Sequence, residues 1–184
     1  MKIITVTGYK SMELGIFKES DEKITYIKKS IENRLIALIE EGLEWILTSG
    51  QLGVELWTAE VVLELQKTYD IKLAIIPAFE NHHSRWPDDM KIKYAELIQA
   101  ADFYDAIYLG DYKAPYQFKE RDLWLINKSD ACLILMDPEY PESTRYFHKL
   151  AEQANDYPIM YITPSDIDDV VEEMAMLDPD YWLQ

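Results

Sequence analysis

Residues 131–136, Ala-Cys-Leu-Ile-Leu-Met, form an unbroken apolar run, and residues 73–76, Leu-Ala-Ile-Ile, form a second one. Successive side chains of a strand point to opposite faces of the sheet, so both faces of these two segments are apolar. Uninterrupted runs of this kind are typical of strands in a parallel sheet that helices cover on both sides. The two runs therefore predict a parallel sheet at the centre of the fold.

Helical and strand-like segments alternate along the rest of the chain, as apolar spacing and turn residues indicate. The predicted strands are Lys2–Thr7, Trp45–Thr48, Lys72–Pro77, Ala106–Leu109, Ala131–Met136 and Ile159–Thr163. The predicted helices are Asp21–Glu41, Val54–Tyr69, Pro87–Ala100, Gln117–Asn127, Thr144–Asn155 and Ile167–Met176, the last one capped by Ser165. This alternation predicts an α/β fold with a doubly wound, mainly parallel, Rossmann-like sheet in a three-layer sandwich. We expect residues 1–184 to form a single domain of this kind, since a TIM barrel needs about 250 residues.

The amino-acid composition excludes several classes of binding partner and predicts where in the cell the protein is found. Of 184 residues, 34 are Asp or Glu and 18 are Lys or Arg, so the net charge is −16 with neutral histidines. A field of this sign repels phosphate backbones and anionic membranes, and we expect neither general nucleic-acid binding nor membrane binding. Cys132, the only cysteine, lies in an apolar run and is predicted to be a buried thiol. Without a disulfide pattern, a signal peptide or a long apolar segment, the sequence predicts a cytoplasmic protein.

The sharpest local signal for a ligand is the turn Ser49-Gly50-Gln51-Leu52-Gly53-Val54-Glu55, which joins a predicted strand to a helix. Two glycines allow a tight turn, and the free N–H groups of a helix N-terminus attract an anion. We expect the phosphate of a ligand to rest on Gly50–Gly53 and Glu55 to accept a hydrogen bond from a ribose hydroxyl. Pairing of Glu55 with the helix dipole is an equally open role. The turn matches neither the Walker A motif nor the dinucleotide fingerprint.

Ligands of doubly wound sheets bind beyond the carboxyl ends of the strands, so the segments after the other strands supply further candidates. Arg85 would pair with a phosphate and Trp86 would stack on a base. Asp111 and Tyr112 would hold a base and its ribose, and Thr144-Arg145 would form an anion site at a helix N-terminus. The candidate ligand contacts are Gly8, Ser49, Gly50, Gln51, Gly53, Glu55, Arg85, Trp86, Asp111, Tyr112, Thr144 and Arg145.

Two other polar segments are assigned no specific chemistry. His82 and His83 are adjacent, so their side chains diverge, and no Cys, Asp or Glu spacing completes a metal site. We therefore expect solvated loop histidines and no bound metal. The segment Gln117–Asp122 is expected to be a solvated helical face, from which Lys119 and Arg121 are able to reach a phosphate.

Four segments together carry a resemblance to a known family. These are Ile-Thr-Val-Thr-Gly-Tyr-Lys at residues 4–10, the turn at 49–55, Pro-Ala-Phe-Glu-Asn-His…Arg-Trp at 77–86, and Tyr-Leu-Gly-Asp-Tyr at 108–112. Over essentially its whole length the chain resembles the YpsA family of small bacterial cytoplasmic proteins. That family belongs to the SLOG group of Rossmann-like domains, whose relatives include the Lonely-guy phosphoribohydrolases and the DNA-binding DprA proteins.

The resemblance implies a nucleotide or nucleotide-derived ligand such as NAD or ADP-ribose, and a sensor or regulatory module linked to bacterial cell division and growth. By position, the family's glycine-rich turn falls on Ser49, Gly50, Gly53 and Glu55, and its first-strand glycine is Gly8. The Pro-Gly-Gly-x-Gly-Thr-x-x-Glu turn of the phosphoribohydrolases is absent, and Met136-Asp137-Pro138 stands at the corresponding strand end. That departure favours ligand binding over hydrolysis.

Two other functions stay open. One is a nucleotide N-glycosidase, in which Glu55 would be the catalytic candidate. The other is a protein-interaction adaptor with a vestigial pocket, acting in cell division through the aromatic tail at 178–184. We expect that tail to dock on the body or on a partner chain, and a homodimer is a further open possibility.

Overall fold

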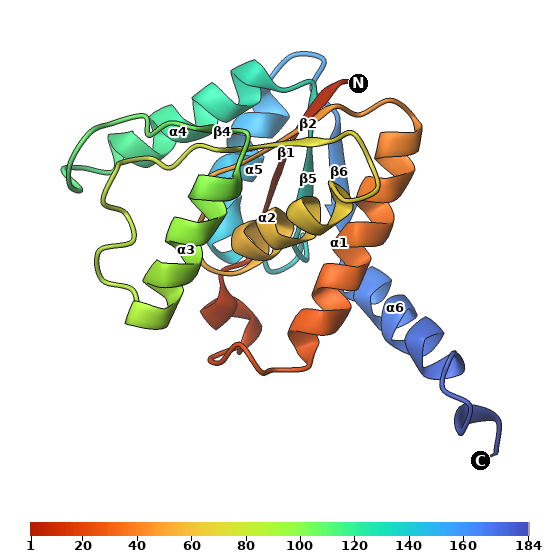
Figure 1. The fold of residues 1–184 in the computed structure, drawn as a ribbon. Helices are drawn as coiled ribbons and strands as arrows, with labels where there is room; N and C mark the ends of the chain where they lie inside the picture. The colour runs from red at the N-terminus through yellow and green to blue at the C-terminus, as the bar shows by residue number, and fades with distance from the viewer. Residues whose placement is uncertain (184) are drawn as a thin grey trace.

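A computed structural model of the protein describes residues 1–183. Six parallel strands form one sheet in the order β4-β3-β2-β1-β5-β6, with helices on both faces (Figure 1). The strands are β1 (Ile3–Gly8), β2 (Trp45–Thr48), β3 (Lys72–Ile75), β4 (Phe103–Tyr104), β5 (Ala131–Leu135) and β6 (Ile159–Ile162). The α-helices are α1 (Lys23–Glu40), α2 (Val54–Leu65), α3 (Asp88–Ala100), α4 (Tyr116–Lys128), α5 (Arg145–Gln153) and α6 (Pro164–Met176). The doubly wound α/β fold with three layers is thereby confirmed.

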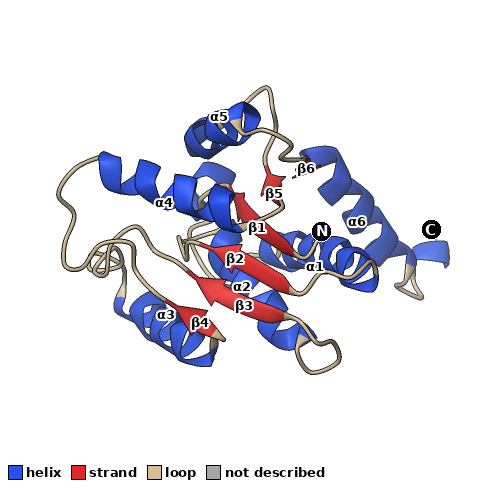
Figure 2. Ribbon diagram, turned by 90° about the horizontal axis from the view of Figure 1, so that it is seen from above, coloured by secondary structure: helices blue, strands red, loops and turns tan. Residues whose placement is uncertain are grey.

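The strand order changes direction at β1. From β1 the chain moves outward through β2, β3 and β4, and it then crosses over to place β5 and β6 on the other side of β1. β1 therefore pairs with β2 on one side and with β5 on the other. Helices α4 and α5 pack together on one face, while α1 packs on α2 and α6 on the other (Figure 2). A switch of this kind opens a crevice at the carboxyl ends of the two strands.

The two apolar runs form the centre of the core. Every residue of β5 is buried, and Leu73, Ala74 and Ile75 of β3 are buried as well. Cys132 is among them, as predicted, and burial raises the pKa of its thiol to about 12. Within residues 1–183, no helix is long and apolar enough to cross a bilayer.

Two local predictions are wrong. The fourth strand is Phe103–Tyr104 rather than Ala106–Leu109, because Tyr108 makes only an isolated bridge to Phe79. The last helix is capped by Thr163 rather than Ser165: the Thr163 hydroxyl accepts a hydrogen bond from the Asp166 N–H, and Pro164 takes the first helical position. Proline suits that position because its missing N–H would have no partner there anyway.

The C-terminal segment does not dock on the sheet. A short 3-10 helix, η3 (Tyr181–Leu183), packs on the end of α6, and the Trp182 Nε1–H donates to the Met176 carbonyl over 3.2 Å. Trp182 is still 71% exposed and Leu177 is 83% exposed. Figure 1 shows this end of the chain projecting from the rest. Through residue 183 the tail therefore contacts the body at the end of α6, and docking on a partner chain, the other alternative, stays a prediction.

Candidate functional site

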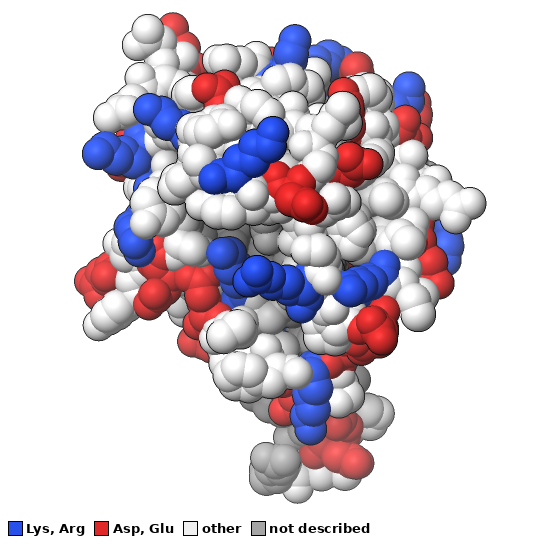
Figure 3. Space-filling model, turned by 90° about the vertical axis from the view of Figure 1, so that its left-hand side faces the viewer, with Lys and Arg blue, Asp and Glu red and all other residues white. Residues whose placement is uncertain are grey.

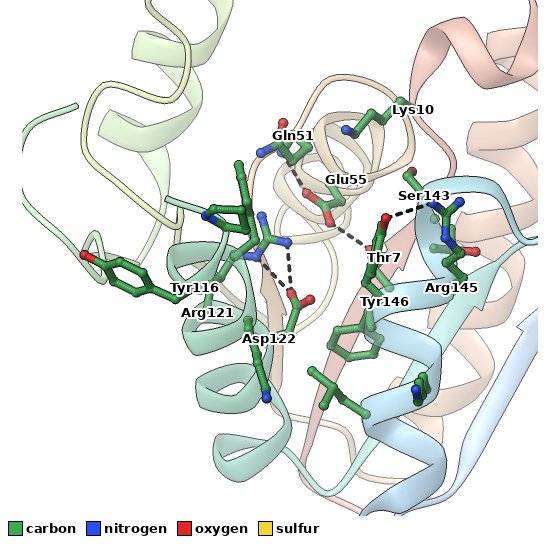
Figure 4. A pocket seen from close by; sticks show the side chains of 18 of the residues that line it. Thr7, Lys10, Gln51, Glu55, Tyr116, Arg121, Asp122, Ser143, Arg145 and Tyr146 are labelled. Atoms are coloured by element: carbon green, nitrogen blue, oxygen red, sulfur yellow. Dashed lines mark hydrogen bonds and ion pairs between the residues drawn. The ribbon is translucent and has the colours of Figure 1, made fainter. Parts of the chain in front are cut away.

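A cavity of about 970 Å³ lies at the switch point between β1 and β5. Its walls come from the end of β1, the start of α2, the first half of α4 and the helix α5 (Figure 4). Pockets that hold small ligands span about 300–1,000 Å³, so this one is at the large end. The lining residues are Thr7, Gly8, Lys10, Gln51, Glu55, Tyr112, Pro115, Tyr116, Phe118, Lys119, Arg121, Asp122, Ser143, Thr144, Arg145, Tyr146, Phe147, Lys149, Leu150 and Gln153.

Glu55 lies at the floor of the cavity and is only 7% exposed. Its Oε1 accepts a hydrogen bond from the Thr7 hydroxyl over 2.8 Å. Its Oε2 accepts one from the Ser49 hydroxyl and one from the Gln51 N–H, the latter over 2.7 Å. One carboxylate therefore joins β1, the end of β2 and the turn before α2. Since a carboxylate offers about four acceptor positions, one position of Glu55 has no hydrogen-bond partner among residues 1–183.

The glycines of the predicted phosphate turn serve chain packing. Gly53 has φ +107°, and a Cβ there would lie 2.6 Å from both the Tyr9 carbonyl oxygen and the Ser11 nitrogen. A Cβ on Gly50 would lie 2.9 Å from Ile75, and one on Gly8 would lie 2.8 Å from the Leu135 carbonyl oxygen. Neither Gly50 nor Gly53 lines the cavity, whereas Gly8 does. The turn is thus tight because neighbouring backbone crosses it at Gly53 and the side chains of Ile75 and Tyr94 pack on it at Gly50.

The expectation that the N–H groups of this turn are free is wrong for two of them. The Gln51 N–H donates to Glu55, and the Val54 N–H donates to the Tyr9 carbonyl over 3.1 Å. Ser49 is buried beneath the cavity and reaches it only through its hydrogen bond to Glu55. At this turn, the residues that line the cavity are Gln51 and Glu55.

Asp122 is a cavity residue that the sequence-based assignment to a solvated face missed. It is 4% exposed, and the Arg121 Nε donates to its Oδ1 over 3.0 Å, while Nη2 lies 2.9 Å from the same oxygen. Burial raises the pKa of Asp122, the Arg121 charge opposes that rise, and the Glu55 charge adds to it. The sequence did carry a signal, because Asp122 precedes the buried Leu125 and Ile126 at helical spacing and so shares their face.

The start of α5 is occupied by the protein's own carboxylate. Glu13 belongs to a 3-10 helix, η1 (Ser11–Leu14), and its Oε2 accepts a hydrogen bond from the Ser143 N–H over 2.8 Å. Its Oε1 accepts from the Ser143 hydroxyl and from the Lys10 N–H. Glu13 therefore joins two segments of the cavity mouth. The N–H groups of Thr144 and Arg145, which the predicted anion site would have offered, donate to the Pro141 and Glu142 carbonyls instead.

Glu13→Gln is expected to remove a pH-dependent part of the stability. Burial raises the pKa of Glu13, but hydrogen bonds from Ser143 and Lys10 outweigh it and hold the pKa below its ordinary value. A depressed folded-state pKa stabilises the protein above the unfolded-state pKa of about 4.3, and that stability is lost as the pH falls through the folded-state value. Urea unfolding of both proteins should therefore show a larger difference at pH 7 than at pH 3. An equal difference at both values would contradict the ionic role of Glu13.

Thr144 and Arg145 both line the cavity, but one side chain is buried and the other is exposed. Thr144 is buried, and its hydroxyl donates to the Pro141 carbonyl. Arg145 is exposed, and it donates to the Glu142 carbonyl over 3.0 Å and to the Tyr146 hydroxyl over 2.8 Å. Its guanidinium lies 4.5 Å from the centre of the Tyr146 ring. Arg145 is therefore the member of the pair with an accessible charge.

Six of the twelve predicted contacts lie outside the cavity lining: Ser49, Gly50 and Gly53 of the turn, and Arg85, Trp86 and Asp111. Arg85 is exposed, and Asp111 accepts a hydrogen bond from the Asn81 side chain over 2.8 Å. Trp86 packs edge-on against Tyr94, with 5.4 Å between their ring centres. Tyr112, in contrast, does border the cavity and lies 5.8 Å from Phe118.

The two adjacent histidines are both partly buried, and His82 is the more enclosed of the two. His82 packs between Trp86 and Tyr94, at ring-centre distances of 5.2 and 4.9 Å. Burial, together with the charges of His83 and Arg121, lowers the pKa of His82 to about 3. His82 is therefore neutral at pH 7 and belongs to an aromatic cluster beside the turn at Gly50. Within the part of the chain that the structure describes, no group of three or more His, Cys, Asp or Glu is arranged to hold a metal ion.

Positive charge collects around the cavity although the chain is strongly acidic. Five cationic side chains line it: Lys10, Lys119, Arg121, Arg145 and Lys149. The acidic lining residues are Glu55 and Asp122. Figure 3 shows Lys and Arg side chains gathered in a band across the displayed face. Since the whole chain carries −16, this local excess of cations marks a surface suited to an anion.

Comparisons with known proteins place the chain in a family. The model of the family described as the YspA SLOG family (YpsA) matches residues 4–167. The chain is 59% identical to a UPF0398 protein of Oceanobacillus iheyensis, over 99% of this chain and all of that protein. It is 46% identical to the UPF0398 protein YpsA of Bacillus subtilis, over 94% of this chain and 98% of that protein. A UPF0398 protein of Staphylococcus aureus is 44% identical over 82% of this chain and 81% of its own length. On these matches the chain belongs to the YpsA family, a SLOG family.

Proposed function

We propose that the protein binds a nucleotide or a nucleotide-derived ligand, of the NAD or ADP-ribose class, in the cavity between β1, α2, α4 and α5. One observation carries the proposal: five cationic side chains border a 970 Å³ cavity at the switch point of a chain with net charge −16. Ligands of doubly wound sheets bind at this place, and phosphate is the anion that Arg and Lys recognise most often there.

Different lining residues would bind the phosphate, the ribose and the base of the ligand. Arg145 and Lys149 on α5, together with Lys10, would neutralise phosphates from one side. Glu55 at the floor would accept a hydrogen bond from a ribose hydroxyl. The rings of Tyr112 and Tyr116 are half-exposed and border the same cavity, so one of them would stack on the base.

Binding of this kind suits a sensor. The family membership is compatible with a cytoplasmic regulatory module in bacterial cell division and growth, and we propose that role for the bound form. In this role ligand binding would change the surface around the cavity mouth, where η1 and the start of α5 meet through Glu13.

Thermal denaturation with AMP, ADP, ADP-ribose and NAD tests the proposal. A ligand at one hundred times its Kd adds about 2.7 kcal/mol, which raises the melting temperature by several degrees. Lys149→Gln should weaken binding roughly tenfold, because it removes an accessible charge at the cavity. Lys128→Gln, at the far end of α4 and outside the cavity lining, is the matched control and should change nothing. No shift with any nucleotide would refute the proposal and favour the adaptor function, with the exposed Trp182 segment as its contact.

A second function, N-glycosidic bond hydrolysis, is favoured by the presence of two carboxylates, Glu55 and Asp122, in one cavity. Glu55 would stabilise the oxocarbenium-like centre while water replaces the base at the sugar carbon and the base leaves with a proton. Chromatography of AMP or NAD after incubation tests this function. Release of free base that disappears in Glu55→Gln would support it, whereas binding without release would exclude it.

A further inference from the structure

The cavity floor holds two carboxylates on different elements, Glu55 on α2 and Asp122 on α4. Both border the cavity, both are more than nine-tenths buried, and the charge of Glu55 raises the pKa of Asp122. In Figure 4 both side chains point toward the same space, beside Thr7 and Arg121. Two buried acidic groups near one another cost folding free energy, so their placement calls for an explanation beyond the fold.

In each carboxylate some acceptor positions are occupied by hydrogen bonds within the protein, and at least one position is unoccupied. Thr7, Ser49 and Gln51 occupy three acceptor positions of Glu55 and leave one on the Oε1 side. Both Arg121 contacts of Asp122 end on Oδ1, so Oδ2 has no hydrogen-bond partner among residues 1–183. The buried Asp122 therefore presents an unpartnered acceptor to the cavity.

We propose that Glu55 and Asp122 together recognise the vicinal 2′- and 3′-hydroxyls of a ribose and thereby select ribonucleotides over 2′-deoxyribonucleotides. This inference rests on the proposed nucleotide-binding function and adds the sugar specificity of that site. Two adjacent hydroxyls supply two donors, and the two open carboxylate oxygens supply two acceptors. The cations toward α5 remain available for the phosphates, so sugar and phosphate contacts do not compete.

The discrimination comes from the missing hydroxyl. A 2′-deoxyribose leaves one buried acceptor without the partner that a ribose provides, and an unpaired buried polar group is costly. A hydrogen bond to a charged group corresponds to roughly 10- to 100-fold in affinity. Shape alone would discriminate little, because the deoxy ligand is smaller and fits wherever the ribo ligand fits.

Calorimetric titration with AMP, 2′-deoxy-AMP and 3′-deoxy-AMP tests the inference on the full chain. The wild type should bind AMP roughly 10- to 100-fold more tightly than either deoxy compound. Asp122→Asn keeps the shape and one acceptor oxygen but removes the charge, and it should reduce this ratio to less than about threefold, chiefly by weakening AMP binding. Asp169→Asn, which changes an exposed carboxylate on α6 outside the cavity, should leave the ratio unchanged.

The outcomes separate the two proposals. Equal binding of AMP and both deoxy compounds to the wild type overturns the sugar specificity but leaves nucleotide binding intact. An unchanged ratio in a folded Asp122→Asn protein overturns the assignment to Asp122. Absence of binding of all three compounds overturns this inference, and absence of binding across the wider nucleotide panel overturns the proposed function as well. Because the wild-type ratio needs no variant, the inference stays testable if Asp122→Asn does not fold.

Discussion

Glu55→Ala is expected to lower the free energy of unfolding by about 3 kcal/mol. The substitution leaves the Thr7 hydroxyl, the Ser49 hydroxyl and the Gln51 N–H without their acceptor. An unsatisfied buried donor costs about 1–3 kcal/mol. Water from the cavity can replace the acceptor at Thr7, which lines it, but not at Ser49, which lies beneath it. Urea unfolding followed by circular dichroism measures the loss, which is large against a typical total of 5–15 kcal/mol.

Glu64→Ala on the same helix is the matched control. Its carboxylate is 72% exposed and pairs only with Lys67, so the loss should stay within about 0.5 kcal/mol. Similar losses for Glu55→Ala and Glu64→Ala would mean that the Glu55 hydrogen bonds do not hold β1, β2 and α2 together. A large loss would also require each Glu55 variant to be tested for folding before its ligand binding is interpreted.

Gly53→Ala is expected to have an effect of similar size, about 3–5 kcal/mol of unfolding free energy. The new Cβ would lie 2.6 Å from the Tyr9 carbonyl oxygen and the Ser11 nitrogen, and 2.9 Å from the Lys10 carbonyl carbon. These are backbone atoms, which cannot move aside as a flexible side chain can. A non-glycine residue at φ +107° adds about 1–3 kcal/mol of strain, and overpacking adds about 1–3 kcal/mol.

Gly15→Ala separates these two costs. Gly15 also has a positive φ, +67°, but nothing lies within 4 Å of its built Cβ. Its loss should therefore be about 1 kcal/mol, from backbone strain alone. Comparison of the urea midpoints of both variants measures the share that comes from the close approach at Gly53. Equal midpoints would show that the segment Tyr9–Ser11 can move away from the turn.

Much of the fold could be predicted because it depends on local patterns. The apolar runs at 73–76 and 131–136 are strands, as predicted, since both faces of those strands are covered by helices. The predicted position of β4 was wrong because this strand has only two residues, both paired with β3. The apolar residues that follow it have an equally high strand propensity. The N-cap of α6 was harder to predict. Thr163 and Ser165 are both suitable capping residues, and the position of Pro164 decides between them.

The sequence predicted where in the fold the candidate site lies, but it predicted only some of the residues that line it. Gly8 at the end of β1, Gln51 in the turn after β2 and Glu55 in the first turn of α2 border the cavity, because parallel strands end at the same edge. Arg85, Trp86 and Asp111 follow strands as well, but β3 and β4 lie on the far side of β2 from the switch point. Which strand ends meet depends on the order of strands in the sheet, and that order is set by long-range packing.

By itself, the sequence determined the alternation of helices and strands, the buried parallel sheet, the acidic surface and the family. Each of these follows from the local composition of the chain and from the spacing of its residues. Only the tertiary structure decided that Asp122 and Glu55 line one cavity, that Glu13 binds Ser143 just before α5, and that Gly53 lies against the backbone of Tyr9–Ser11. These contacts join segments up to 130 residues apart. Their partners are chosen by the three-dimensional packing of α4 and α5 against β1, which no spacing along the chain encodes.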